Sequence, residues 1–230
     1  HSRRRTATAM NVKNFGIPGA NTARILREEL PQALAFRPTL TILLCGTNDT
    51  CNSHALIPAE ESGRNIRTIL EELRKAGSDF LLMTPPPFCS DLLLERHSIE
   101  AYGTSGPEQR MEAFRRMLKE LAGERGIPLL DLVPPFLERD LHAEDSYLTN
   151  PRNSPWRDGL HPNRNGYRRM AELLAGILAE KKRWNTARVA CLGDSITYGQ
   201  YMSGAGTAEG ETYPAFLKSM LCGNSDSGSR

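Results

Sequence analysis

Short apolar runs alternate along the chain with longer stretches in which apolar residues recur every three or four positions. The short runs have the length of strands and are bounded by turn residues. They predict strands at residues 10–15, 39–45, 80–84, 127–132 and 188–192. The longer stretches predict helices at residues 21–34, 58–76, 107–125, 163–182 and 213–221. This alternation predicts a parallel sheet covered on both faces, which is a three-layer α/β/α sandwich.

Breaks in the pattern predict a helix end and the position of a binding site. Pro31 predicts a break near the end of the first helix. Residues 85–106 and 134–162 lack periodicity, and each stretch follows a predicted strand. Ligands of parallel sheets bind beyond the carboxyl ends of the strands, so we expect these loops, together with residues 51–57, to line a pocket. Four aromatic residues are candidate walls of that pocket: Phe88, Tyr102, Phe136 and Trp156.

Composition and charge exclude several function classes. The chain has 230 residues, 24% of them charged, and a formal net charge of +2, which is typical of a globular protein with no dominant electrostatic partner. Nucleic acid is therefore not expected as a partner, and the basic cluster at residues 3–5 is interpreted as a solvated tail. No apolar run approaches the 18 residues or so that a membrane-spanning helix needs.

Cysteine usage gives a weak indication of compartment. The five cysteines form an odd set without a C-x-x-C pair, which indicates neither a zinc site nor a disulfide framework. Cys45 and Cys191 end apolar runs and are expected to be buried free thiols, which favours a reducing, cytoplasmic compartment. No apolar segment near the start resembles a signal peptide, but the chain begins at His1 and this pattern does not decide export.

Residues 193–195 have the sequence Gly-Asp-Ser and follow an apolar strand. A serine after a glycine at the end of a strand can expose its hydroxyl above the sheet. The same tripeptide is also a common turn. It is not the G-x-S-x-G elbow, because position 197 is Thr.

Asp158 and His161 lie three residues apart in a turn that opens the predicted helix at 163–182. A carboxylate at this spacing can hold the imidazole in one tautomer and stabilise its charged form. A lone histidine is more often structural. The other histidines have no comparable neighbourhood and are predicted to be surface or loop residues: His1, His54, His97 and His142.

Two further blocks follow strands. Residues 14–21 lack the first glycine of the dinucleotide fingerprint, so Gly19 could instead offer its N–H group to an oxyanion, or the segment could be a simple tight turn. Asn48, after the strand at 39–45, could aim its amide at a developing negative charge. Alternatively, Asn48 and Asp49 cap a helix or form a turn.

All four blocks are expected at one edge of the sheet, and together they resemble the blocks of the SGNH (GDSL) hydrolase family over nearly all of residues 8–222. The resemblance implies a flavodoxin-like fold with a five-stranded parallel sheet and ester hydrolysis by a serine nucleophile. It implies no metal or organic cofactor. The residues that match the family's blocks have these implied roles: Ser195 as nucleophile, Asp158 and His161 as the acid–base pair, and Ser195, Gly19 and Asn48 as the oxyanion hole.

The order of the blocks departs from the family. The family places the serine block first, whereas here it follows the Asp-His block. Moving residues 187–230 ahead of residue 1 would restore the usual order, so the chain is interpreted as one circularly permuted domain of residues 1–230. Two alternatives stay open. The sequence could span parts of two tandem copies, or residues 187–230 could be exchanged between the members of a homo-oligomer.

The expected function is hydrolysis of small acyl esters, with a small-molecule ester as the partner. A carbohydrate O-deacetylase or an acyltransferase of the same family is an alternative. An alternative from another class is a non-catalytic module that binds an anion at residues 16–21.

Overall fold

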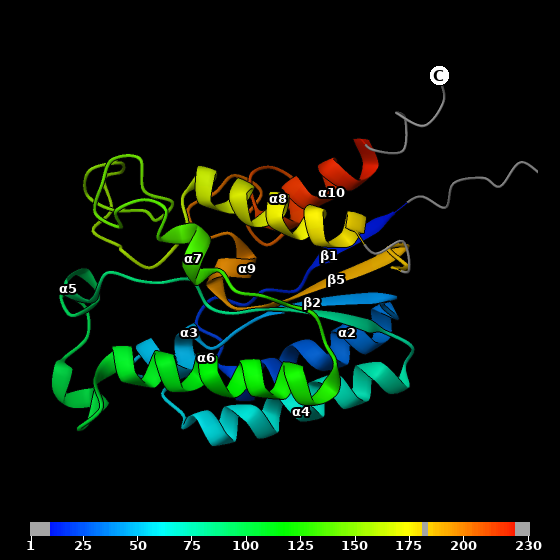
Figure 1. Ribbon diagram of the computed structural model, residues 1–230, viewed down its shortest axis with the longest axis horizontal. Coiled ribbons are helices and arrows are strands. Elements are labelled where there is room, and N and C mark those ends of the chain that lie inside the picture. Colours follow the sequence, from blue (N-terminus) through cyan, green and yellow to red (C-terminus); the bar gives the residue numbers. More distant parts are fainter. Residues whose placement is uncertain (1–9, 181–183, 224–230) are drawn as a thin grey trace, which may run out of the picture.

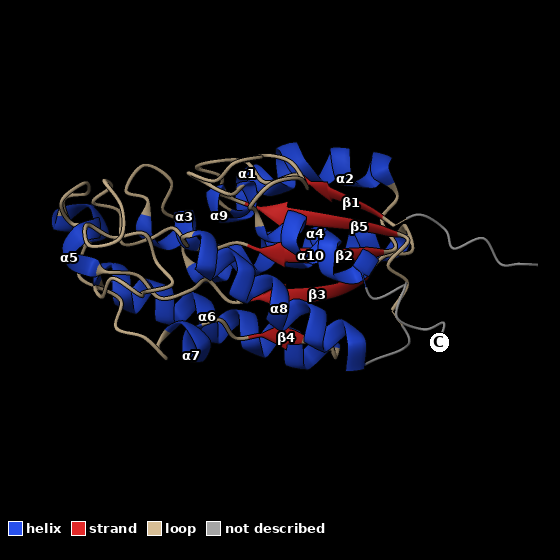
Figure 2. Cartoon of the chain, turned by 90° about the horizontal axis from the view of Figure 1, so that it is seen from above, coloured by secondary structure: helices blue, strands red, loops and turns tan. Residues whose placement is uncertain are grey.

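A five-stranded parallel sheet lies at the centre of residues 10–180 and 184–223, the part of the chain that the computed structural model describes. Its strands are β1 (Asn11–Asn14), β2 (Leu40–Leu44), β3 (Asp79–Met83), β4 (Leu129–Leu130) and β5 (Arg188–Gly193). They are ordered β1-β5-β2-β3-β4, and every neighbouring pair is parallel. In Figure 2 all the arrows point the same way, so the carboxyl ends of the strands meet at one edge.

Helices cover both faces of the sheet (Figure 1). On one face lie α7 (Val133–Phe136), α8 (Arg164–Glu180) and α10 (Tyr213–Gly223). On the other lie α1 (Thr22–Arg24), the π-helix η1 (Ile25–Glu29), α2 (Leu30–Phe36), α4 (Ala59–Lys75) and α6 (Gly106–Arg125). Short helices lie towards the carboxyl edge: α3 (Thr47–Cys51), α5 (Ser90–Leu93), the 3-10 helix η2 (Ile99–Tyr102) and α9 (Ser195–Tyr198).

The central strands are apolar throughout because each face packs against helices. Along β2, Ile42 and Leu44 belong to the core beneath α8 and α10, whereas Leu43 belongs to the core beneath α4 and α6. All three side chains are buried. The predicted three-layer α/β/α sandwich is therefore confirmed.

The predicted strands are found, although β4 has only two residues. The break predicted at Pro31 is wrong, because the helical segment continues to Phe36. Pro31 lies directly after the π-helix η1, where the hydrogen bond from the N–H of Leu30 spans five residues, to the carbonyl of Ile25, and the helix continues past the proline. The basic cluster at residues 3–5, His1 and the last residues of the helix predicted at 163–182 lie outside the described residues.

The loop after β1 binds the segment that contains β5 and α9. The amide of Asn14 donates to the carbonyls of Thr197 (2.9 Å) and Thr207 (3.0 Å). A Cβ atom on Gly16 would lie 2.4 Å from the backbone nitrogen of Tyr198, so this close approach needs glycine. These contacts hold residues 197–207 at the carboxyl edge of the sheet.

No helix in the described part of the chain is both long enough and apolar enough to cross a bilayer.

Candidate active site

Ser195 is the first residue of α9, directly beyond the carboxyl end of β5. Asp194 caps this helix, and its Oδ1 accepts the N–H of Ile196 at 2.9 Å. Position 193 has room only for glycine, because a Cβ atom there would lie 2.1 Å from the carbonyl oxygen of Leu44. The turn therefore packs tightly on β2 and presents Ser195 with 8% of its surface exposed.

The turn before α8 brings Asp158 and His161 to the same edge. Oδ1 of Asp158 accepts the backbone N–H groups of Leu160 (2.8 Å) and His161 (2.6 Å). Oδ2 of Asp158 lies 2.9 Å from Nδ1 of His161, and Nε2 of His161 lies 2.8 Å from Oγ of Ser195. Carboxylate, imidazole and hydroxyl thus form one hydrogen-bonded series.

The environment of Asp158 favours its ionised form. Burial acts to raise the pKa of Asp158, but the hydrogen bond and charge of His161, with the backbone N–H groups, outweigh burial and lower it to about 2. Tyr201 adds a hydrogen bond from its hydroxyl to Oδ2 at 3.0 Å. Burial and the charge of Asp158 raise the pKa of Tyr201 to about 12, so the phenol stays a donor. An ionised Asp158 orients the imidazole so that Nε2 can accept the proton of Ser195.

A cleft of about 280 Å³ opens over this series and also contains Gly19 and Asn48 in its wall. Gly19 has a φ of 79°, which favours glycine. No acceptor for the backbone N–H of Gly19 or Ser195 is found among residues 10–180 and 184–223. Nδ2 of Asn48 donates to the carbonyl of Ala20 at 3.1 Å, which leaves its second N–H available. All five residues singled out from the sequence therefore meet at one cleft.

Residues 51–57 and 85–106 contribute to the cleft wall as expected, and the second loop supplies Arg96 and His97. Of residues 134–162, only the turn at 158–161 contributes. Tyr201 was not expected in the wall, and no individual role was predicted for Arg96 or His97.

Arg96 donates to the carbonyls of Asp158 (2.8 Å) and Arg157 (2.6 Å), so it stabilises the turn that contains Asp158 and His161. His97 was expected to be a surface or loop residue. It does lie in a loop, between α5 and η2. Its Nδ1 lies 2.7 Å from Oγ of Ser53, and burial followed by the charge of Arg96 lowers its pKa. No local spacing in the sequence signals these contacts, because all of them are made between distant segments.

None of the four aromatic residues expected in the wall is among the residues that line the cleft. Phe136 is buried in the core beneath α8, Phe88 packs beside Met111, and the hydroxyl of Tyr102 donates to the carbonyl of Cys51 at 2.6 Å. They anchor loops, because their rings are large enough to fill the space under them. Trp156 is exposed and stacks on Tyr201, with ring centroids 5.1 Å apart and planes 10° apart.

Two buried carboxyl groups, those of Glu29 and Asp194, lie at the turn formed by residues 193–195. Oε2 of Glu29, in η1, accepts the N–H of Gly193 at 2.9 Å. Oε1 of Glu29 and Oδ2 of Asp194 have no hydrogen-bond partner among the described residues. Burial raises the pKa of Glu29 to about 9 and that of Asp194 to about 7.

A model of the GDSL-like lipase/acylhydrolase family matches residues 2–169, more than half of the chain. The chain belongs to this family. The resemblance seen in the four sequence blocks is thereby confirmed, and the GDSL-family protein is classed with the carboxylic ester hydrolases. The family match ends before β5 and α9, the segment that contains Ser195.

Solved structures share the fold of this GDSL-family protein. A protein assigned as an acylhydrolase from Bacteroides fragilis NCTC 9343 superposes with a TM-score of 0.54 at 18% identity, covering 70% of this chain and 71% of that one. A GDSL-like lipase from Bacteroides thetaiotaomicron VPI-5482 gives 0.53 at 19% identity, covering 70% and 72%. The acetyl xylan esterase AlAXEase gives 0.52 at 23% identity, covering 71% and 78%. A search of curated proteins finds no match.

Proposed function

We propose that the protein is a serine esterase that hydrolyses short acyl esters, with Ser195 as nucleophile, His161 as general base and acid, and Asp158 as the group that orients His161. The observation that carries the proposal is the hydrogen-bonded series of these residues, with separations of 2.9 Å from Asp158 to His161 and 2.8 Å from His161 to Ser195. Separations of this size are those of an activated nucleophile and its base.

The reaction proceeds in two halves. Nε2 of His161 takes the proton from Ser195 as Oγ attacks the carbonyl carbon of the ester. The imidazolium then protonates the departing alcohol, which leaves an acyl group on Ser195. Water enters, gives its proton to His161 and attacks the acyl carbonyl, and His161 returns the proton to Ser195. Asp158 balances the charge of the imidazolium at both stages.

We propose that the negative oxygen of each tetrahedral intermediate is bound by the backbone N–H groups of Ser195 and Gly19 and by the side-chain amide of Asn48. All three residues line the same cleft as His161. The side chain of Asn52 donates to Oδ1 of Asn48 at 3.0 Å, and Nδ2 of Asn48 donates one N–H to the carbonyl of Ala20, so the amide is held at both ends and its second N–H remains available. Donors fixed in advance stabilise a developing oxyanion without reorganisation.

A carbohydrate O-deacetylase is a second candidate function. This candidate rests on the stacked rings of Trp156 and Tyr201, because both are exposed and Tyr201 lies in the cleft wall. A flat aromatic pair beside the nucleophile offers a platform for a sugar ring, whose axial C–H groups pack on aromatic faces. One of the structures of similar fold is an acetyl xylan esterase.

Hydrolysis of p-nitrophenyl acetate tests the main proposal. Ser195→Ala is expected to abolish activity and leave the melting temperature unchanged, while the matched control Ser203→Ala, an exposed serine in the same segment, keeps full activity. A pure Ser195→Ala preparation that retained most of the activity would overturn the role of Ser195. A series of esters from acetyl to decanoyl then measures the acyl length that the cleft accepts.

The sugar platform has its own test. Trp156→Ala is expected to raise the KM for an acetylated xylo-oligosaccharide and to leave hydrolysis of p-nitrophenyl acetate unchanged. Leu137→Ala removes another exposed apolar side chain and serves as the control. Equal effects of Trp156→Ala on both substrates would contradict the platform.

We also propose that residues 1–230 form one domain with a circularly permuted order. Counting β5 first renumbers the sheet order from β1-β5-β2-β3-β4 to 2-1-3-4-5, the flavodoxin-like order. In that numbering α10, which packs on α8 and β1, becomes the crossover helix of the first βαβ unit. A variant with residues 187–230 moved ahead of residue 1 is expected to keep its activity. If the segment is instead exchanged between molecules, mixing the inactive variants Ser195→Ala and His161→Ala would restore activity.

A further inference from the structure

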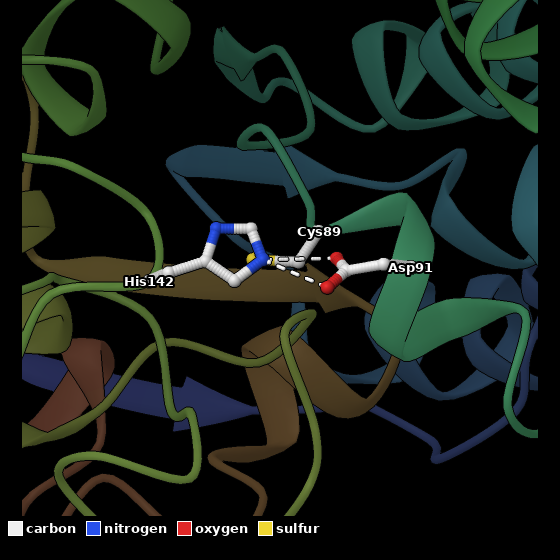
Figure 3. A group of neighbouring side chains, drawn as sticks. All are labelled: Cys89, Asp91 and His142. Carbon is white, nitrogen blue, oxygen red and sulfur yellow. Dashed lines mark hydrogen bonds and ion pairs between the residues drawn. The ribbon is translucent and has the colours of Figure 1, made fainter.

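Three potential metal ligands, none of them a proposed catalytic residue, lie close together (Figure 3). Cys89 precedes α5, Asp91 lies in α5, and His142 comes from the loop between α7 and α8. One sulfur, one carboxylate oxygen and one imidazole nitrogen from these residues all lie within 4.8 Å of one another. Nε2 of His142 lies 2.9 and 3.1 Å from the two oxygens of Asp91.

The three donors match the ligand chemistry of zinc. Zn²⁺ binds cysteine sulfur, histidine nitrogen and carboxylate oxygen in a tetrahedron, with adjacent ligand atoms about 3.3–3.6 Å apart. The donors of Cys89, Asp91 and His142 already lie near this spacing and need to move by no more than about 1.5 Å. Three protein ligands leave the fourth position for water, since the side chains of Asp91 and His142 are exposed.

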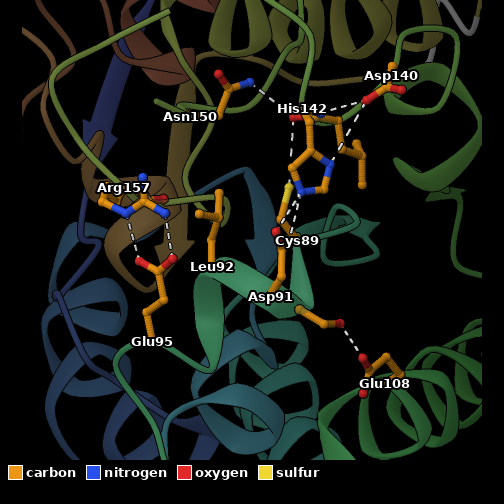
Figure 4. Close-up of polar contacts among 12 residues, drawn as sticks. Cys89, Asp91, Leu92, Glu95, Glu108, Asp140, His142, Asn150 and Arg157 are labelled. Carbon is orange, nitrogen blue, oxygen red and sulfur yellow. Dashed lines mark hydrogen bonds and ion pairs between the residues drawn. The ribbon is translucent and has the colours of Figure 1, made fainter. Parts of the chain in front are cut away.

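The surroundings of His142 suit a metal ligand. Nε2 faces the other donors, while Nδ1 lies 3.9 Å from Oδ1 of Asp140. The same oxygen accepts the backbone N–H of His142 at 2.7 Å, which fixes this carboxylate beside the ring (Figure 4). A carboxylate next to the nitrogen that does not bind the metal is the usual support of a metal-binding histidine.

The local charge favours a cation. Among the described residues, Asp91 and Asp140 have only His142 as an ion-pair partner, with no lysine or arginine paired to either. The arginine labelled in Figure 4, Arg157, is paired with Glu95. Cys89 is buried, and its thiol has one weak contact, to the carbonyl of Leu141 at 3.7 Å.

We propose that Cys89, Asp91 and His142 form a binding site for one divalent transition-metal ion, with Zn²⁺ as the best match. No short sequence motif indicates this site, because His142 lies about fifty residues from the other two ligands.

An ion at this site would connect the loop of His142 to the start of α5, next to the turn at residues 158–161. The backbone N–H of Cys89 donates to the carbonyl of Gly159 at 2.8 Å, within the turn that contains Asp158 and His161. The side-chain amide of Asn150 donates to the carbonyls on either side of His142, those of Leu141 (3.0 Å) and Ala143 (2.9 Å). Metal binding would therefore fasten the loop of His142 to α5 beside the catalytic turn. The expected role is structural, and the site stands independently of the proposed esterase activity.

Titration of the chelator-treated full chain with Co²⁺ and Zn²⁺ tests the site. We expect one Co²⁺ per chain, a thiolate-to-cobalt charge-transfer band in the near ultraviolet, and loss of this band when Zn²⁺ is added. Cys89→Ser and His142→Ala should each remove the band, while the controls Cys222→Ser and His54→Ala keep it.

Asp140→Asn should weaken Zn²⁺ binding about 10–100-fold. Zinc at 100 times its Kd should raise the melting temperature by about 5–10 °C.

Two outcomes would overturn the site. One is a wild-type chain that binds no Co²⁺ or Zn²⁺. The other is a Cys89→Ser variant that binds Zn²⁺ as tightly as the wild type, which would reduce the cluster to an exposed His142–Asp91 ion pair. His142→Ala changes an exposed side chain, so it reports on the site even if Cys89→Ser fails to fold. Hydrolysis of p-nitrophenyl acetate by the metal-free chain is expected to persist, which separates a failure of this site from a failure of the esterase proposal.

Discussion

Acidic residues lie on both sides of the Gly193–Ser195 turn, and their environments have opposite effects on protonation. On the cleft side, Asp158 accepts hydrogen bonds from two backbone N–H groups, the ring of His161 and the hydroxyl of Tyr201. Its pKa is about 2 although the side chain is buried. On the other side, Glu29 and Asp194 each have one oxygen without a partner in the described chain, and burial raises their pKa values to about 9 and about 7.

The difference shows that burial alone does not decide the charge of a carboxyl group. The number of donors and the neighbouring charge decide it. Asp158 has enough of both to remain an anion, as a partner of an imidazolium must. Glu29 has a single donor, and in its neutral form it supports the backbone of Gly193 without placing a second negative charge near Ser195.

Replacement of a carboxyl by an amide on each side tests this contrast, and the largest effect is expected for Asp158→Asn. An amide can donate to Nδ1 of His161 and so favour the wrong tautomer. We therefore expect kcat/KM for p-nitrophenyl acetate to fall about ten-thousand-fold. The matched control is Glu29→Gln on the other side of the turn. A loss below about tenfold for Asp158→Asn would contradict the assigned role.

Asn48→Ala is expected to give the next largest effect, because it removes one proposed donor to the oxyanion. Turnover should fall by about a hundredfold or more. Asn52→Ala removes only the group that holds the amide of Asn48, so a smaller loss is expected. A change below about threefold for Asn48→Ala would show that its amide does not face the oxyanion.

Tyr201→Phe removes one of the hydrogen bonds to Asp158 and keeps the ring that stacks on Trp156. A single hydrogen bond contributes about 0.5–1.5 kcal/mol, so kcat/KM should fall about two- to tenfold. An unchanged kcat/KM would mean that the hydroxyl of Tyr201 does not act on Asp158.

Glu29→Gln should change activity least and should instead change the pH dependence of stability. Because the pKa of Glu29 is raised when folded, the folded chain holds a proton that the unfolded chain releases above about pH 4.3. The wild type therefore loses stability as pH rises toward 9, and Glu29→Gln should lose less. Melting temperatures from pH 5 to 9 measure this, and parallel curves for the two chains would refute a neutral Glu29.

Asp158 should make the stability of the fold depend on pH in the opposite direction. Because its folded pKa is lowered, its contribution to stability is complete above the unfolded pKa of about 3.9 and is lost as pH falls toward 2. Asp158→Asn should flatten the acid side of the stability curve and leave the alkaline side unchanged.

The sequence predicted the parts of the molecule that depend on local pattern. Strands, the two-sided core and the blocks of Ser195 and His161 follow from periodicity and short-range spacing. The sequence placed residues 85–106 at the cleft but did not predict Tyr201 there or the contacts of Arg96 and His97, because tertiary packing alone brings these side chains together. Glu29 was also missed, since a glutamate on an amphipathic helix is normally solvent-exposed and only the buried N–H of Gly193 accounts for it.

Covalent trapping tests the central claim, the activation of Ser195 by His161, most directly. The full chain is treated with a fluorophosphonate and the modified peptide is identified by mass spectrometry. The account predicts one phosphonylated residue, Ser195, with no adduct in Ser195→Ala and a much slower reaction in His161→Ala. An adduct on another residue, or labelling at the same rate in His161→Ala, would contradict it.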